Sequence, residues 1–593
     1  MAMNAAMTGP AGTGPAGTGT ADGGWRRKGH RALRGAVCAL ALPVCAQALP
    51  VVPAAAQTTA PPADRLFLHG QVLAPAGTAQ ALALRGGVIV AVGSDAEILA
   101  LPHAGAEVVD LAGRTLMPGL YDMHVHVMDA GLAERACHLP QGGGAAAVKA
   151  AVQACARQVG PGGWILGGSW VAAALRPGEQ TARLLDEAAP DHPVALSDEA
   201  HHSLWVNSRA LAIAGITAAT PAPAGGVIDR DAAGAPLGVL RETATALVES
   251  HIPAASPEEK LAAVEAATTE MLSYGIVGFT DAAVRPANAQ ALSAYARSGG
   301  LKQHARGCIV WGPMSNGAEA LIARRQELSA GPMRFDCVKI FLDGVPTESH
   351  TGAMVEPYAH TSGAHGILQV PQARLNAAVA AFDAQGLEVK MHAAGDGATR
   401  AAADAIAWAR AQNGALGPRH EIAHNTFITA ADVPRGRQLG FIWEFSPYIW
   451  WPTPITSVDI ARAVGPERMR RLWPIREALA TGALVIAGSD WPVVPSVNPW
   501  LAIETMVSRQ APGATGPAQG AAEAVSRAQA LAIFTRNGAA AMGRLDSGGT
   551  LEPGKQADMI VIDRNPLTAP LGSLHATRVL ATYIAGAQVW AAR

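Results

Sequence analysis

The sequence has few charged residues, few aromatic residues and few cysteines for a chain of 593 residues. Lys and Arg (45) nearly balance Asp and Glu (47), which excludes a general basic surface of the kind that binds nucleic acid. The six cysteines form no CxxC pair and are too sparse for a disulfide-rich scaffold. Hydrophobic residues make up 49% of the chain, which excludes a largely disordered protein. We therefore expect a large globular enzyme with a small-molecule substrate.

Residues 1–57 are predicted to be a leader outside the fold. The chain opens with a stretch rich in Gly, Ala and Thr, which we expect to be disordered. A basic cluster at 25–34, an apolar run and a small-residue ending then follow in the order of a secretory signal peptide, at about 25–56. A membrane anchor is the alternative, but prolines within the run favour cleavage. We expect an exported protein, periplasmic or secreted, with no stable membrane insertion; the export route, Sec or twin-arginine, stays open.

The mature chain divides into two β-rich ends and a long α/β middle. Short β-rich runs separated by turns occupy residues 65–117 and 545–593, which predicts one small β-sandwich built from both ends. Between them, residues 118–540 alternate apolar runs with Ala-rich helical stretches, the pattern of a parallel (β/α)8 TIM barrel. Residues from about 128 to 270 are too long for one strand–helix unit, so we predict an inserted subdomain there. The predicted fold class is therefore α/β, a barrel with an insertion and a composite β-sandwich.

The first candidates for chemistry are His124 and His126, which follow a Pro-Gly turn at the start of the predicted barrel. Alternate residues of a strand face the same side, so both imidazoles are expected to point into the barrel interior. Two neutral imidazoles on one face make half of a metal site. The pair alone is a weak signal, and its place on the first strand after the β-rich end strengthens it.

Four further candidates follow at the ends of predicted strands, where barrel active sites are built: Lys339, His392, His424 and Asp490. Lys339 lies in an apolar run, and burial lowers a lysine pKa, which favours the neutral amine that reacts with carbon dioxide to give a carbamate ligand. Asp490 is suited to bind metal and to accept a proton from water. A structural alternative stays open for each residue: a salt bridge for Lys339, hydrogen-bonded core positions for the histidines, and a helix cap for Asp490.

The order of these residues along the chain resembles that of the amidohydrolase superfamily. Within it, the chain resembles the amidohydrolase family 3 group, which includes N-substituted formamide deformylase-like hydrolases. The resemblance covers about residues 65–590. Its most specific segments are 118–126, 202–208, 338–344, 392–396, 488–492 and 548–558.

The resemblance implies a divalent metal centre, with zinc as the expected metal and one or two ions. It implies that His124 and His126 bind the more buried ion and that a carboxylated Lys339 is the bridge. It also implies that His392 and His424 bind the second ion. Asp490 would be both a ligand and the catalytic general base.

Five residues are candidate substrate contacts. His202 and Asn207 lie in the predicted insertion, and a structural hydrogen-bonded pair is the alternative interpretation. Trp443, Trp451 and Trp491 belong to a concentration of aromatic residues in a chain with only 5% aromatics. They are expected to line an apolar pocket for a bulky N-substituent or aryl group, with a packed loop as the alternative.

We expect the protein to hydrolyse a carbon–nitrogen bond, of amide or formamide type, through a metal-activated water. A lactonase or esterase and a deaminase on the same barrel are the alternatives among enzymes. From another class, the alternative is a catalytically silent exported protein that binds a metal or a ligand, although the presence of all six predicted ligands counts against it. The subunit number stays open, a homo-oligomer included.

Overall fold

A computed structural model describes residues 61–592, apart from residues 134–135, 141, 200–201, 314, 316, 348, 360 and 495. The predicted leader, residues 1–57, lies outside the described residues. Within the described part, none of the helices combines the length and the apolar character needed to cross a membrane.

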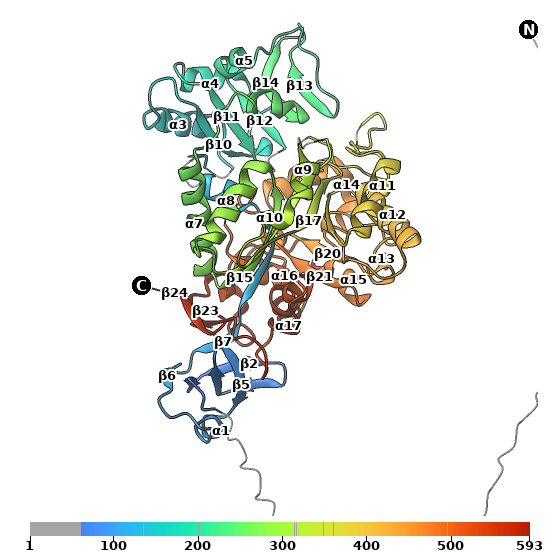
Figure 1. Cartoon of the computed structure of the whole chain (residues 1–593). Helices are drawn as coiled ribbons and strands as arrows, with labels where there is room; N and C mark the ends of the chain where they lie inside the picture. Colours follow the sequence, from blue (N-terminus) through green and yellow to red (C-terminus); the bar gives the residue numbers. More distant parts are fainter. Residues whose placement is uncertain are drawn as a thin grey trace, which may run out of the picture. The chain divides into compact units, whose positions relative to one another are not determined.

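Eight parallel strands form the barrel, and their order in the sheet follows their order in the chain (Figure 1). They are β8 (Leu120–Val125), β15 (Ile276–Val284), β16 (His304–Trp311), β17 (Met333–Phe341), β18 (Glu388–Ala393), β19 (Glu421–His424), β20 (Ile442–Phe445) and β21 (Leu484–Ala487). Nearly every residue of these strands is buried, as expected for a sheet covered on one face by helices and filled on the other by side chains. The predicted TIM-barrel fold class is confirmed.

The segment after β21 joins the last strand to the first. The backbone N–H of Asp490 donates to the carbonyl of His124 at 2.7 Å, and the N–H of His126 donates to the carbonyl of Trp491 at 2.9 Å. A side-chain carbon at Gly488 would lie 2.3 Å from Cβ of His124, so only glycine permits this approach. The closure therefore places Asp490 beside His124 on β8 and His126 just after it.

Helices pack on the outside of the barrel. In α7 (Pro257–Ser273), Ser256 and Glu259 form a capping box and proline occupies the first turn, which fixes where the helix starts. Its buried residues Val264 and Met271 join the main core, so α7 belongs to the helical layer of the barrel. The other main helices of this layer are α8 (Pro286–Arg297), α11 (Gln372–Ala384), α12 (Asp396–Asn413), α14 (Ala461–Met469), α15 (Ile475–Ala480), α16 (Pro499–Ser508) and α17 (Arg527–Ala532).

A separate six-stranded sheet lies between β8 and α7 in the sequence, in the order β13-β14-β12-β11-β10-β9. Its strands are β9 (Cys137–His138), β10 (Ile165–Trp170), β11 (Val194–Asp198), β12 (Ser203–Val206), β13 (Gly226–Arg230) and β14 (Pro236–Glu242), with helices α3 (Ala145–Ala156), α4 (Ala182–Ala188) and α5 (Ser208–Ile213). Its own core is built around Trp170 and Trp205, whose rings meet edge to face at 5.9 Å. The insertion is therefore a folded unit that can hold side chains in fixed positions.

The two ends of the chain share a six-stranded sheet in the order β24-β23-β22-β7-β2-β3. A four-stranded sheet, β5-β4-β1-β6, comes from the N-terminal end alone. The strands are β1 (Arg65–Leu68), β2 (Gln71–Ala74), β3 (Gly77–Ala79), β4 (Ala81–Arg85), β5 (Val88–Gly93), β6 (Glu107–Asp110), β7 (Thr115–Pro118), β22 (Met559–Ile562), β23 (Val579–Ile584) and β24 (Ala587–Ala591). The rings of Phe67 and Tyr583 meet at 5.3 Å in their common core.

All four cysteines of the described residues are paired. Cys137 on β9 is bonded to Cys155 on α3, within the insertion. Cys308 and Cys337 join neighbouring barrel strands β16 and β17. These cysteines thus form two local disulfide cross-links rather than a disulfide-rich scaffold.

The barrel interior contains a chain of buried charges. Arg306 on β16 contacts Glu388 at 2.7 Å and Glu421 at 2.5 Å. Lys390 on β18 contacts both Glu421 and Glu444. Each charge is paired, which is the condition for burying ions at an acceptable cost in free energy. The chain ends at Glu444, next to the candidate site.

Candidate metal centre

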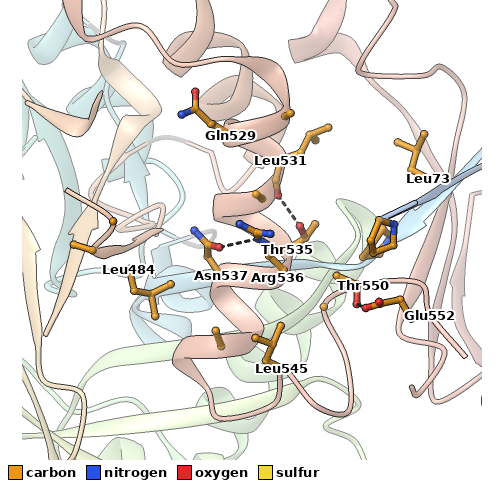
Figure 2. Close-up of a pocket in the computed structure, with 18 of the residues that line it drawn as sticks. Leu73, Leu484, Gln529, Leu531, Thr535, Arg536, Asn537, Leu545, Thr550 and Glu552 are labelled. Carbon is orange, nitrogen blue, oxygen red and sulfur yellow. Dashed lines mark hydrogen bonds between the residues drawn. The ribbon is translucent and has the colours of Figure 1, made fainter. Parts of the chain in front are cut away.

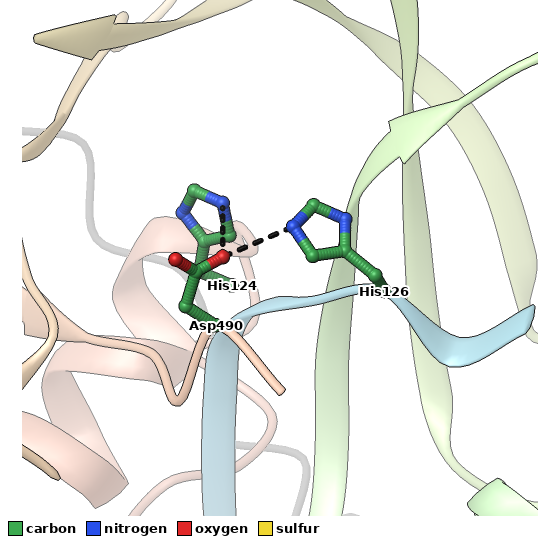
Figure 3. A group of neighbouring side chains, drawn as sticks. All are labelled: His124, His126 and Asp490. Carbon is green, nitrogen blue, oxygen red and sulfur yellow. Dashed lines mark hydrogen bonds and ion pairs between the residues drawn. The ribbon is translucent and has the colours of Figure 1, made fainter. Parts of the chain in front are cut away.

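His124, His126 and Asp490 bring three ligand atoms together at the carboxyl end of the barrel, all within 4.8 Å of one another (Figure 3). His126 Nε2 lies 3.0 Å and His124 Nε2 lies 3.4 Å from Oδ1 of Asp490. His124 is fully buried, while His126 and Asp490 keep 14% of their side chains exposed. The cluster is therefore sealed on the barrel side and open on the other, as a catalytic site requires.

Lys339 is fully buried on β17 and faces the same cluster, with Nζ 3.3 Å from His124 Nε2. No carboxylate of the described residues lies within ion-pair distance of Nζ, and Asp343, on the loop after β17, contacts His392. Burial lowers the pKa of Lys339 to about 8, although the charge of Glu444 opposes this. The neutral fraction of the amine near pH 7 is therefore much larger than for a lysine in water, although the protonated form still predominates.

His392 and His424 complete the convergence. Their ring centroids are 4.4 Å apart, and the ring of His424 lies 4.7 Å from that of His124. His424 Nδ1 is 3.8 Å from Oδ2 of Asp490. The structure thus brings all six predicted ligands to one end of the barrel, although they come from five different strand ends. Their roles as ligands stay predictions.

Carboxylates orient two of these histidines. Nδ1 of His124 lies 2.7 Å from Oε1 of Glu444, and Nδ1 of His392 lies 2.9 Å from Oδ1 of Asp343. Because a carboxylate accepts, Nδ1 carries the proton and Nε2 keeps its lone pair for a metal ion. Glu444 is not among the residues predicted from the sequence, although a charged residue inside the apolar run of β20 is the same signal that indicates Lys339.

Two of the predicted ligands have strained backbones. His424 and Asp490 have φ angles of 74° and 64°, in the left-handed region that residues other than glycine seldom occupy. Such conformations cost about 1–3 kcal/mol each and persist where the surrounding structure enforces them, often at functional sites. The strain turns both side chains toward the common cluster at the point where their strands end.

The environment keeps Asp490 ionised. Burial acts to raise its pKa, but the hydrogen bond and charge of His126 and the charge of Lys339 hold the pKa of Asp490 below its ordinary value. A carboxylate in this state can accept a proton at neutral pH.

The donor set fits a divalent cation. Nε2 of His424 is buried and has no hydrogen-bond partner among the described residues. The adjoining donors are imidazole nitrogens and one carboxylate, the ligands that zinc and similar ions prefer. A bound cation would satisfy the unpartnered nitrogen and offset the desolvation of the cluster.

The predicted substrate contacts fall in different places. His202 lies beside the cluster, with its ring 5.3 Å from that of His392. Trp491 is adjacent to Asp490 and buried, and Trp451 is half-buried on the segment after β20; their contacts with substrate stay predictions. Two predictions need correction, those for Asn207 and Trp443.

Asn207 is fully buried and caps helix α5. Its Oδ1 accepts from the N–H groups of Val194 and Ala210, and its Nδ2 donates to the carbonyl of His192. Three of the four hydrogen-bonding positions of the amide are used inside the insertion, and the side chain is fully buried there. The structural alternative is therefore the right one for this residue.

Trp443 faces the wrong side of its strand. Its neighbour Glu444 points into the barrel, so Trp443 points outward, where its Nε1 donates to the carbonyl of Val433 and its ring packs on Phe441 at 4.7 Å. It is a core residue between the barrel and its helices.

A cavity of about 1010 Å³ lies at the opposite end of the barrel (Figure 2). Its lining includes Met117, Phe441 and Leu484, which lie at the amino ends of barrel strands, together with Leu531 and Lys555. Barrel enzymes act at the carboxyl ends of their strands, so this cavity is separate from the metal centre.

A parallel barrel with histidines, a lysine and an aspartate at its carboxyl end is the arrangement of a metal-dependent hydrolase. The sequence model of the amidohydrolase family matches residues 107–590, and the chain belongs to this family.

Similar proteins include an N-substituted formamide deformylase of Arthrobacter pascens, 29% identical over 86% of this chain and 94% of that protein. The Arabidopsis thaliana protein LONG AFTER FAR-RED 3 is 30% identical over 89% of this chain and 92% of its own length. Among solved structures, an uncharacterized metal-dependent hydrolase from Pyrococcus horikoshii has the same fold, with a TM-score of 0.68 and 21% identity over 86% of this chain and 99% of that one.

Proposed function

We propose that the protein hydrolyses a carbon–nitrogen bond of amide or formamide type, with His124, His126, Lys339, His392, His424 and Asp490 as metal ligands and Asp490 as general base. The observation that carries the proposal is the convergence of these six side chains from five strand ends onto one cluster. The similarity to a formamide deformylase supports an acyl C–N bond over an ester or a ring C–N bond.

In the proposed reaction, the metal ion, Asp490 and Lys339 have different roles. A bound divalent cation, with zinc as the expected metal, would activate a water molecule and polarise the acyl oxygen. Asp490 accepts a proton from the water and passes it to the leaving nitrogen, which it can do because it is ionised and lies between the two histidine pairs. The neutral amine of Lys339 adds carbon dioxide at Nζ and releases one proton, which gives an anionic carbamate; Asp490 is the one carboxylate residue among the six proposed ligands.

The test is a metal analysis combined with a screen of acyl amides, formamides and esters. Bound zinc with turnover of amides or formamides is the expected result. Preferential turnover of esters or lactones would favour the esterase alternative, and bound metal with no hydrolysis of any acyl compound would favour a silent binding protein.

We also propose that the protein is exported and cleaved near Gln57. The two disulfides support this, because disulfides form and persist in oxidising compartments. Sequencing the first residues of the mature protein tests the proposal. A start within residues 1–24 would contradict it.

A further inference from the structure

The cavity at the amino ends of the barrel strands has an apolar lining (Figure 2). Its floor is formed by the buried side chains of Met117, Phe441 and Leu531, and its rim includes Leu545 and Leu567, which are 41% and 40% exposed. Exposed apolar side chains that gather at one place mark binding sites, whereas scattered ones need no explanation. The lining therefore suits the apolar part of a ligand.

The cavity is large enough for a ligand and joins two parts of the fold. Its volume of about 1010 Å³ lies at the upper end of the range for small-molecule pockets. Side-chain carbons at Gly440 and Gly482 would meet no atom within 4 Å, so these glycines leave open space. Leu73 lines the cavity from the sheet shared by the chain ends, and Leu484 lines it from the barrel. A bound molecule would therefore contact both.

Three arginines give the cavity a positive charge. Arg419 precedes β19, Arg437 lies on α13 (Arg435–Leu439), and Arg536 lies on the helical turn η6 (Ile533–Asn537). Within the described residues none of them forms an ion pair, and the guanidinium group of Arg536 has one long hydrogen bond, of 3.4 Å, to Oδ1 of Asn537. An arginine keeps its charge throughout the physiological pH range, so these charges do not depend on titration.

The described residues of the lining include one carboxylate, and it is already paired. Glu552 Oε2 lies 3.0 Å from Nζ of Lys555, which also donates to Oγ1 of Thr550 at 2.6 Å. The chain as a whole has a formal net charge of −2, so the three guanidinium groups are a local excess and not part of a generally basic surface. Like charges that share a cavity repel each other, and a bound anion lowers this repulsion.

We propose that this cavity binds a free carboxylate with a long unbranched hydrocarbon chain, as in a fatty acid. The arginines donate to the carboxylate, for which the planar guanidinium group is suited, and the chain covers the apolar floor. A purely apolar molecule would leave the three charges without a partner, and a small anion would leave the floor in contact with water. The cavity lies at the end of the barrel opposite the metal centre, so the inference goes beyond the proposed function and does not rest on it.

A series of ligands tests the two parts of the site. Calorimetric titration of the purified protein with hexanoate, octanoate and decanoate should show an affinity that rises about 10-fold with each added pair of methylene groups. Octylammonium and 1-octanol should bind at least about 10-fold more weakly than octanoate, because neither carries a negative charge. Equal affinities of acetate and decanoate, or of 1-octanol and octanoate, would overturn the proposal.

Replacing two of the arginines locates the binding site. We expect decanoate to bind about 10–100-fold more weakly to the double variant Arg419→Gln and Arg437→Gln, since two charge-assisted donors are lost. The matched control is Arg209→Gln with Arg462→Gln, which removes two exposed arginines of α5 and α14 outside the lining and should leave the affinity unchanged. Equal affinities in the two double variants would overturn the proposal, because the anion would then lie elsewhere, the metal centre included.

A further variant tests the position of the chain. Ala528 is an exposed residue of α17 in the lining, and Ala528→Trp fills part of the cavity but keeps all three arginines. The gain in affinity from hexanoate to decanoate, about 100-fold in the wild type, should fall below about 10-fold. An unchanged gain would overturn the proposal, because the chain would then lie outside the cavity. None of these measurements depends on turnover, so they decide the inference even where the protein hydrolyses no acyl compound.

Discussion

Lys339 and Glu444 are buried charged residues, each flanked by apolar residues in its barrel strand. A buried charge costs free energy unless it is paired or has a function, so such positions are visible in a sequence. What the sequence does not show is the partner. Glu444 contacts His124, which lies 320 residues earlier in the chain. Only the closed barrel brings these two residues together.

Replacing the proposed base separates chemistry from metal binding. We expect Asp490→Asn to retain zinc, because the four histidines and Lys339 remain, and to lower kcat by about 10²–10⁴-fold, because the amide cannot accept a proton. Steady-state kinetics and elemental analysis of the same preparation check this. Turnover close to that of the wild type would remove Asp490 from the role of base.

Glu444 should act on metal affinity. We expect Glu444→Gln to weaken zinc binding by about 10–100-fold, since His124 loses the carboxylate that fixes its tautomer. Competition with a chromophoric chelator measures the affinity. Glu388→Gln is the control, because Glu388 belongs to the same buried chain of charges but contacts Arg306 rather than a predicted ligand. Equal losses in both variants would show a general effect on the barrel interior.

The two wrong substrate predictions have a common physical cause. Aromatic and amide side chains have several uses, and the choice depends on which face of an element they occupy. Trp443 faces outward because Glu444 faces inward, and Asn207 serves as a helix cap. His and Lys at the ends of barrel strands have fewer structural uses, so the residues of the metal centre could be proposed from the sequence. The positions of Trp443 and Asn207 could not be predicted in this way.

At the scale of elements, the sequence predicts barrel strands that are continuous apolar runs, such as β21. Strands β16 and β20 are less visible because Arg306 and Glu444 interrupt their apolar pattern. These charges are tolerated only because partners on other strands neutralise them, which local sequence does not reveal. The fold class follows from the repeat of strands and helices, whereas the interior of the barrel follows from long-range pairing.

The contacts of the Asp383 carboxylate, which link α11 to α12 and to the segment before β19, should make the free energy of unfolding depend on pH. Asp383 contacts Arg410, Asn413 at 2.9 Å and His420 at 3.0 Å. Burial acts to raise its pKa, but the hydrogen bonds from His420 and Asn413 and the charge of Arg410 lower it to about 2. The ordinary value is about 3.9, so this stabilisation is present above about pH 4 and is lost as the pH falls toward 2.

We therefore expect Asp383→Asn to lower the urea midpoint at pH 7, and the gap to the wild type to narrow as the pH falls below 4. Asp404→Asn is the control on α12, since its half-exposed ion pair with Arg435 should contribute little. A gap for Asp383→Asn that stays constant down to pH 3 would show that its carboxylate charge is not the stabilising feature.

For the whole molecule, the cysteines report on processing. Cys38 and Cys45 lie in the predicted leader, and the other four of the six cysteines are paired. Thiol titration of the denatured, unreduced protein should therefore find no free thiol if the leader has been removed, and four after reduction. Two free thiols before reduction and six after it would indicate that the leader is retained, and four or more before reduction would indicate that the disulfides are not formed.

The sheet shared by the two ends of the chain has a consequence for synthesis. Strand β7 emerges from the ribosome early, but its partner β22 follows more than 400 residues later. Until then, the edge of β7 that will pair with β22 exposes unpaired backbone groups, which are a template for wrong pairing with other chains. The shared sheet can therefore form only after β22 has been made, so translation that stops before residue 559 leaves a chain with an open, aggregation-prone strand.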